Sequence, residues 1–172
     1  MKKYILLFLL IPFISTAQFG LGIGFSTKPM FVFYGQYQKK KNVFQIGFIR
    51  ELGKGAIGQA KFDRLSNYGT TSLGSDNYII GADFGYNRYI FKNIAIGGEI
   101  TFASKRYFTN YSDKRFNGGG YHLIYSKEPI QGIGVNIKYK YKKNYTFLAG
   151  FNTMKGIQIG AAIDLFGIHN SE

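Results

Sequence analysis

The chain of 172 residues has no cysteine, no tryptophan and only three prolines. Without cysteine it can form neither a disulfide framework nor a thiolate metal site, although small exported domains often depend on disulfides. The only two histidines, His122 and His169, are far apart in the sequence and offer too few ligands for a zinc site. We therefore predict that the protein holds no metal and no cofactor.

The first 17 residues have the pattern of a secretory signal peptide. Two lysines precede the apolar run 4–14, and small residues at 15–17 allow cleavage after Ala17. The run is shorter than the roughly 20 residues that a membrane-spanning helix needs, and no longer apolar run follows it. We expect residues 1–17 to be removed and residues 18–172 to form one domain; an uncleaved membrane anchor is the alternative.

Acidic residues are scarce, because nine Asp and Glu face 22 Lys and Arg, and the formal charge is +13. A basic chain of this kind could bind nucleic acid, but export argues against such a partner. Anionic lipids or the phosphates of lipopolysaccharide are better matched to an exported basic protein. The sequence leaves the oligomeric state open.

The abundant feature of the sequence is alternation between large apolar and small or polar residues. In segment 19–26, Phe19, Leu21, Ile23 and Phe25 alternate with glycine and serine, which is the period of a β-strand with one apolar face. The same alternation recurs along the chain, and several of the segments approach the roughly 9–11 residues that a tilted strand needs to cross a membrane. About eight strands are predicted: 19–26, 31–38, 44–48, 78–87, 94–102, 133–141, 145–152 and 157–165.

The polar face of these segments indicates which side meets lipid. In a soluble sandwich or a lipocalin the polar face meets water, and it would carry many lysines and glutamates. Here that face is mostly Gly, Gln, Asn and Thr, which suits the crowded interior of a narrow barrel, while the long aromatic-rich face suits contact with lipid. We predict an all-β fold, a closed antiparallel up-and-down transmembrane β-barrel of about eight strands. A soluble exported β-barrel is the alternative.

The connections between the predicted strands are unequal in length. Segments 51–75 and 104–131 are long, whereas 27–29 and 153–155 are short, and a further hairpin within 55–65 would raise the strand count. Short basic turns alternate with these connections, at 39–42, 91–93 and 142–144. Short turns on one rim and longer loops on the other are typical of outer-membrane barrels. Tyrosines that could form an interfacial girdle flank the basic turns: Tyr86, Tyr89, Tyr139, Tyr141 and Tyr145.

Over residues 18–166 this pattern resembles the small outer-membrane β-barrels of the OmpA/OmpX-like and OmpW-like families, within the porin superfamily. The resemblance implies a location in the bacterial outer membrane, insertion by the outer-membrane assembly machinery, and contact with outer-membrane lipid and lipopolysaccharide. Such barrels often end on an aromatic residue, whereas here residues 167–172 follow Phe166.

Two sets of charged residues are candidates for function. The first set is predicted to point into the barrel: Asp83, Glu99, Lys138, Lys140 and Asp164. Because unpaired buried charge is costly, we expect these side chains to pair inside the lumen; a proton or ion path is the alternative. The second set makes the long connections basic, with Tyr68, Tyr107 and Tyr111 interleaved: Lys54, Lys61, Arg64, Arg106, Lys114, Arg115 and Lys127. Its members could bind lipopolysaccharide phosphates or another anionic ligand, or simply form a solvated surface.

Some small barrels of this kind hydrolyse or transfer the acyl chains of lipid A, which needs a nucleophile beside a base. His122, Ser126 and Glu128 lie together in the second long connection, but their spacing does not match the lipid A deacylase or phospholipase patterns. We therefore predict a non-enzymatic barrel that stabilises the outer membrane or binds a surface ligand through its basic loops. The first alternative is a narrow channel for small or hydrophobic molecules, although side chains normally fill an eight-stranded lumen. The second alternative is a lipid A-modifying enzyme.

Overall fold

The computed structural model of the chain describes residues 17–52, 55–142 and 144–166. No helix in these ranges is long and apolar enough to cross a membrane. The described residues form nine strands: β1 (Ala17–Ser26), β2 (Met30–Lys39), β3 (Asn42–Glu51), β4 (Gln59–Lys61), β5 (Ser72–Tyr89), β6 (Ile94–Ser112), β7 (Gly120–Tyr141), β8 (Tyr145–Asn152) and β9 (Gly156–Phe166).

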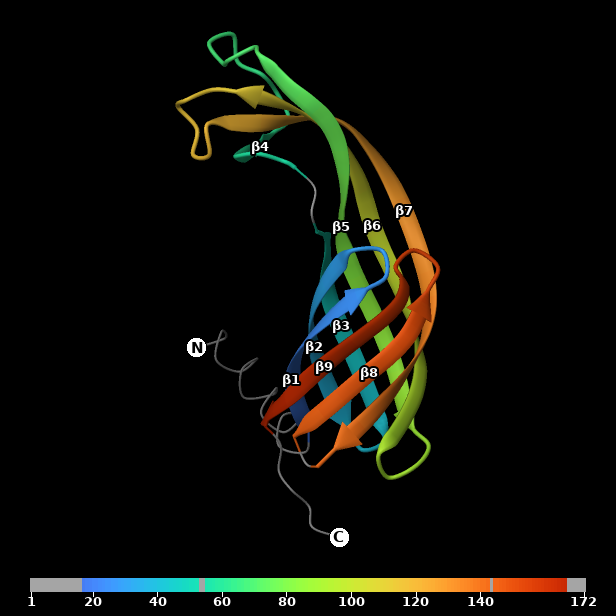
Figure 1. Cartoon of the computed structure of the whole chain (residues 1–172). Coiled ribbons are helices and arrows are strands. Elements are labelled where there is room, and N and C mark those ends of the chain that lie inside the picture. The colour runs from blue at the N-terminus through green and yellow to red at the C-terminus, as the bar shows by residue number, and fades with distance from the viewer. Residues whose placement is uncertain (1–16, 53–54, 143, 167–172) are drawn as a thin grey trace, which may run out of the picture.

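Eight of these strands form a closed ring, which Figure 1 shows as the barrel. Starting from β1, the ring runs through β2, β3, β5, β6, β7, β8 and β9 in chain order, and β9 pairs with β1 to close it. Every pairing within the ring is antiparallel. Closure leaves no open sheet edge around the ring, and the predicted closed antiparallel barrel of about eight strands is confirmed.

The outside of the barrel carries an apolar belt. In β3, the outward Phe44, Ile46 and Phe48 are 47–60% exposed, whereas Val43 before them, Gln45 between them and Ile49 after them are buried. Every strand of the ring exposes at least one large apolar side chain in this way. An apolar surface of this extent is unfavourable in water but is what a lipid-facing barrel wall requires. The barrel is therefore of the transmembrane kind.

The lumen is filled by side chains. One apolar layer is built around Met30, Tyr34 and Ile49, and a second around Val43 and Tyr89 near the basic turns. Polar and charged side chains occupy the space between these layers. The interior is thus a packed core, as is usual for a barrel of eight strands. Tyr89 was predicted to belong to the interfacial girdle and is instead buried at 7% exposure, because its side chain is on the inner face of β5.

Strands β5, β6 and β7 contain 18, 19 and 22 residues and continue past the barrel, where they arch over beyond its rim (Figure 1). We call this part the outer extension; it comprises residues 55–80 and 103–131. The prediction that 104–131 is a long loop is wrong, because β6 and β7 pair along most of it and leave only a turn at 113–119. This paired region lies beyond the closed ring and its apolar alternation is weak, and a bulge at Tyr125 changes the register of the alternation.

The first long connection adds one short strand to the extension. The sequence allowed a hairpin within 55–65, but β4 stands alone and pairs in parallel with β7, with Gln59 opposite Tyr121. Nearby, the alternation along 78–87 predicts that Tyr78 faces outward with Phe84 and Tyr86. Its ring is buried at 6% exposure because Phe108 and Ile124 pack against it.

Candidate functional site

The barrel interior contains a buried ion triad of Lys155, Asp83 and Glu99. The Lys155 Nζ atom lies 2.6 Å from Asp83 Oδ2 and 2.8 Å from Glu99 Oε1, and all three side chains are at most 1% exposed. Thr101 donates a 2.5 Å hydrogen bond to Asp83 Oδ1, and the Asn152 amide donates to Glu99 Oε1 at 2.8 Å. Each carboxylate therefore has both a counter-charge and a neutral donor, which offsets the cost of burying it.

A second polar group lies closer to the basic turns. Lys138 Nζ donates to the side-chain oxygens of Gln45 at 2.7 Å and Gln36 at 3.2 Å. The Gln36 amide in turn donates to Asp164 Oδ1 at 3.0 Å, and Lys140 Nζ lies 3.1 Å from Asp164 Oδ2. Lys138 is thus linked to the Asp164 carboxylate through Gln36, whereas Lys140 contacts that carboxylate directly.

The five residues predicted to form one interior cluster are thus placed in two groups. Asp83 and Glu99 belong to the triad, and the other three belong to the group around Lys138. The sequence did not predict Lys155 as a member of the interior cluster. Lys155 lies in the connection after β8, and strand alternation does not tell which way a side chain in a connection points. The one available signal was a charge imbalance, because the predicted cluster holds three acids and two bases.

The outer extension carries an aromatic cluster of Tyr68, Tyr111, Phe116 and Tyr121. The Tyr121 ring lies at its centre, with ring-centre distances of 5.3 Å to Tyr68, 5.4 Å to Tyr111 and 5.2 Å to Phe116. Its hydroxyl donates to the Gly69 carbonyl at 2.8 Å, and burial raises the pKa of the Tyr121 phenol. The cluster joins the first long connection to the turn between β6 and β7.

Three predicted loop cations lie over this aromatic cluster. Lys61 Nζ is 5.8 Å from the ring centre of Tyr68 and 5.2 Å from that of Phe116. The guanidinium groups of Arg64 and Arg115 lie 5.9 Å from Tyr111 and 5.7 Å from Tyr68. Cations within about 6 Å of a ring centre are attracted by its electron-rich face, so the rings hold Lys61 and Arg64 in place without neutralising their charge.

Arg115 also closes the turn that contains it. Its Nη2 atom lies 2.6 Å from Asp113 Oδ2 and donates to the Asn67 carbonyl. Asp113 Oδ2 also accepts a 2.8 Å bond from the Gly69 amide. These hydrogen bonds, that from Arg115 above all, hold the pKa of the Asp113 carboxyl well below its usual range. Arg115 is therefore already paired, whereas its neighbour Lys114 is exposed.

The remaining predicted loop cations are placed as follows. Lys127 is exposed, and its Nζ atom lies 4.2 Å over the Phe62 ring. Arg106 is half-buried and pairs across the sheet with Lys127 on one side and Tyr78 on the other. Lys54 lies outside the described residues. The extension thus gathers exposed and ring-held cations from β4, the loop after it, the 113–119 turn and β7.

His122 is not the solvated loop residue that its position suggested. It is 6% exposed, its Nδ1 atom is 2.9 Å from the Ile57 carbonyl oxygen, and its ring packs edge-on against Phe108. Ser126 pairs with β6 three residues away from the position opposite His122, which separates the two by roughly 10–13 Å along the strand. Glu128 accepts a 3.0 Å bond from the Tyr107 hydroxyl. The structure does not bring these candidate catalytic groups together.

Among the residues that the structure describes, no three His, Asp or Glu side chains lie close enough together to hold a metal ion.

No family model matches the chain, and no curated protein sequence matches it. Solved structures of small outer-membrane β-barrels do align with it. Ail, the attachment invasion locus protein of Yersinia pestis, aligns with a TM-score of 0.46 and 9% identity over 86% of this chain and 90% of Ail. Neisserial surface protein A aligns with a TM-score of 0.43 and 11% identity over 87% of this chain and 94% of that protein. The N-terminal barrel domain of Pseudomonas aeruginosa OprF aligns with a TM-score of 0.44 and 8% identity, covering 87% and 96%. All three TM-scores are below 0.5 and all three identities are 11% or less, so these alignments identify neither a family nor a role. The barrel fold follows from the strand pairing of the chain itself.

Proposed function

We propose that this chain is a non-enzymatic outer-membrane protein whose outer extension binds an anionic ligand at the cell surface. The groups that it binds are the phosphates of lipopolysaccharide. The proposal includes export by a signal peptide at residues 1–17 and insertion by the outer-membrane assembly machinery. The observation that carries it is the seating of Lys61 and Arg64 on one aromatic cluster.

Cations held over rings suit anion binding better than cations in ion pairs. A cation paired to a carboxylate is neutralised, whereas a ring contact leaves the charge available and restricts the motion of the long side chain. The extension contains seven Lys and Arg against four Asp and Glu, so its net charge is positive. Phosphate groups near such a surface are attracted by about 1 kcal/mol per basic residue.

The test is binding of purified lipopolysaccharide to the detergent-solubilised protein. Exchanging Arg64, Lys114 and Lys127 for glutamine removes three exposed cations, and we expect binding to weaken roughly 100-fold at low salt. Arg115 is left unchanged because its loss would open the turn at Asp113. The matched control is the same exchange at Arg88, Lys92 and Lys142, one exposed arginine and two exposed lysines near the turns of the opposite rim. Equal weakening by both triple variants would show attraction to net charge alone and would refute the proposal.

The contents of the lumen support a barrel that does not conduct. The triad, the group around Lys138 and two apolar layers occupy the interior, which favours ligand binding by the extension over the narrow-channel alternative. For the enzyme alternative, the test is lipid A composition: we expect His122→Ala to leave it unchanged, because the buried ring packs against Phe108 with no nucleophile beside it.

A further inference from the structure

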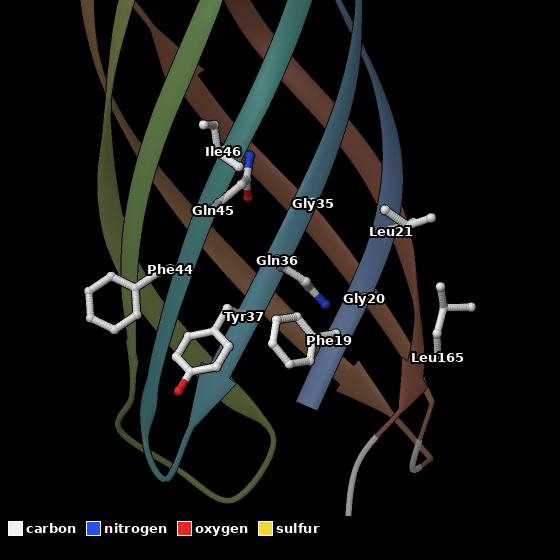
Figure 2. Close-up of a pocket in the computed structure, with 10 residues that line it drawn as sticks. All are labelled: Phe19, Gly20, Leu21, Gly35, Gln36, Tyr37, Phe44, Gln45, Ile46 and Leu165. Atoms are coloured by element: carbon white, nitrogen blue, oxygen red, sulfur yellow. The ribbon is translucent and has the colours of Figure 1, made fainter. Parts of the chain in front are cut away.

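A groove on the lipid-facing wall of the barrel lies over Gly35 in β2. Figure 2 shows Gly35 between Ile46 of β3 and Leu21 of β1, with the rings of Phe44 and Tyr37 nearer the turn. A Cβ atom added to Gly35 would meet nothing within 4 Å. The groove has a volume of about 520 Å³, within the roughly 300–1,000 Å³ of ordinary ligand pockets.

The groove exists because one outward position lacks a side chain. Along β2, the outward positions on either side of Gly35 are occupied by Phe33 and Tyr37. Across the sheet, Gly35 faces Leu21 on one side and Ile46 on the other. The single glycine therefore leaves a hollow framed by large apolar side chains, shaped for a flexible hydrocarbon chain.

A second, smaller groove lies on the other side of Leu21. It has a volume of about 380 Å³ and is lined by Ile23, Phe33, Phe147 and Ala161 among others. Leu21 contributes to both grooves and forms the ridge between them. Two adjoining hollows with one ridge match the two chains of a diacyl lipid.

Basic side chains lie at the end of the first groove that is nearer the turns. Lys40 and Lys41 form the turn between β2 and β3, and both are exposed. The turn is fixed by a hydrogen bond from the Gln38 amide to the Lys40 carbonyl at 3.2 Å, and segment 36–47 contains no Asp or Glu. Its positive charge is thus not offset within its own hairpin.

The depth of the groove fits a lipid whose phosphate sits at this turn. Gly35 is four residues from Lys39, which is roughly 13 Å along the strand and about 10 Å in depth for a strand tilted by about 40°. The interfacial layer of a bilayer is about 5–7 Å thick on each side. With the lysines in that layer, the hollow at Gly35 falls within the upper part of the acyl chains.

We propose that this wall is a binding site for an anionic diacyl phospholipid, with one acyl chain over Gly35 and the phosphate at Lys40 and Lys41. The site is separate from the outer extension and does not depend on the function proposed for it. The occupant is a membrane lipid rather than a protein because the hollow is apolar, opens on the lipid-facing wall and lies next to the exposed lysines of the turn, Lys40 and Lys41.

The experiment is native mass spectrometry of the detergent-solubilised barrel titrated with phosphatidylglycerol or phosphatidylcholine of identical acyl chains. We expect the first phosphatidylglycerol to bind more tightly than phosphatidylcholine. Exchanging Lys40 and Lys41 for glutamine should weaken phosphatidylglycerol about 30-fold, equivalent to about 2 kcal/mol, and abolish the preference. Gly35→Leu places a side chain in the hollow, where its Cβ atom would meet nothing within 4 Å, and should weaken both lipids.

Ala149→Leu is the control, because it places a leucine at an exposed outward position of β8 that lines neither groove. Folding of each variant is checked by the mobility of the unboiled protein on a detergent gel. Equal affinity for the two lipids, or equal effects of Gly35→Leu and Ala149→Leu, would overturn the proposal. Dimers that Gly35→Leu disrupts would also overturn it, since the groove would then be an interface between two copies of the chain.

Discussion

The buried triad makes a quantitative prediction about stability. In Lys155→Met the side chain keeps its approximate length and loses its charge, so Asp83 and Glu99 remain side by side without a counter-ion. Their carboxylate oxygens lie 2.6 and 2.8 Å from the amine that is removed, and the side chains are at most 1% exposed. Removing one partner of a buried ion pair costs about 3–5 kcal/mol, and we expect that loss in the free energy of unfolding.

The assay is a urea titration in detergent micelles, with the folded fraction read from the mobility of unboiled samples. The control is Lys28→Met, which removes an exposed lysine next to Lys155; the backbone amide of Lys28 donates to the Lys155 carbonyl and is kept in the variant. This exchange should change the free energy of unfolding by less than about 0.5 kcal/mol. Combining Lys155→Met with Asp83→Asn and Glu99→Gln should recover most of the loss, because a neutral set can replace a buried ionic one at little cost. A loss of less than about 1 kcal/mol in Lys155→Met, or a triple variant no more stable than the single one, would show that Lys155 does not stabilise the two carboxylates.

Three further predictions concern the lumen and the extension. Gly22→Ala should destabilise by about 1–3 kcal/mol in the same titration, because its Cβ would lie 2.3 Å from the Tyr34 ring; Gly35→Ala, with open space around it, should be near neutral, and equal effects would contradict this packing. Planar bilayers containing the protein should show no steady single-channel conductance, and a stable open level would mean that the lumen is not filled. Because hydrogen bonds from Arg115 hold the pKa of Asp113 low, this contact should be fully present above the usual Asp pKa of about 3.9 and be lost only as pH falls below that toward the lower folded value. Protease resistance of the extension should therefore not change between pH 7 and 5, whereas Asp113→Asn should reduce it throughout; a fall in resistance already at pH 5 would show that another group controls the docking.

The barrel was predictable from sequence because each lipid-facing residue reports its environment independently. Phe44, Ile46 and Phe48 are apolar because lipid lies beside each of them. The alternation can therefore be recognised in the sequence of one strand without knowing its neighbours. The extension was not predictable in this way, because Tyr78 and Phe108 are buried against each other rather than against lipid. Its pattern depends on contacts between distant segments, which a single sequence does not reveal.

The charged residues show the same limit. Asp83 and Glu99 could be assigned to the lumen because they lie within regular strands, where side chains alternate between the two faces. Lys155 lies in a turn, where no such rule applies, and only the three-dimensional structure brings it to them. The parallel pairing of β4 with β7 is equally non-local, since it joins residues about 60 positions apart.

The basic residues of the chain thus lie in three different environments. In the lumen, lysines such as Lys155 are bound by buried carboxylates, and their role is to neutralise the core. On the extension, cations such as Lys61 lie over aromatic rings, which fix the side chain and leave the charge available. At the turns, Lys40 and Lys41 are exposed beside an apolar groove. Only the last two groups can attract an anion, and they lie at opposite ends of the barrel, so a ligand at one end and a lipid at the other can be bound without competition.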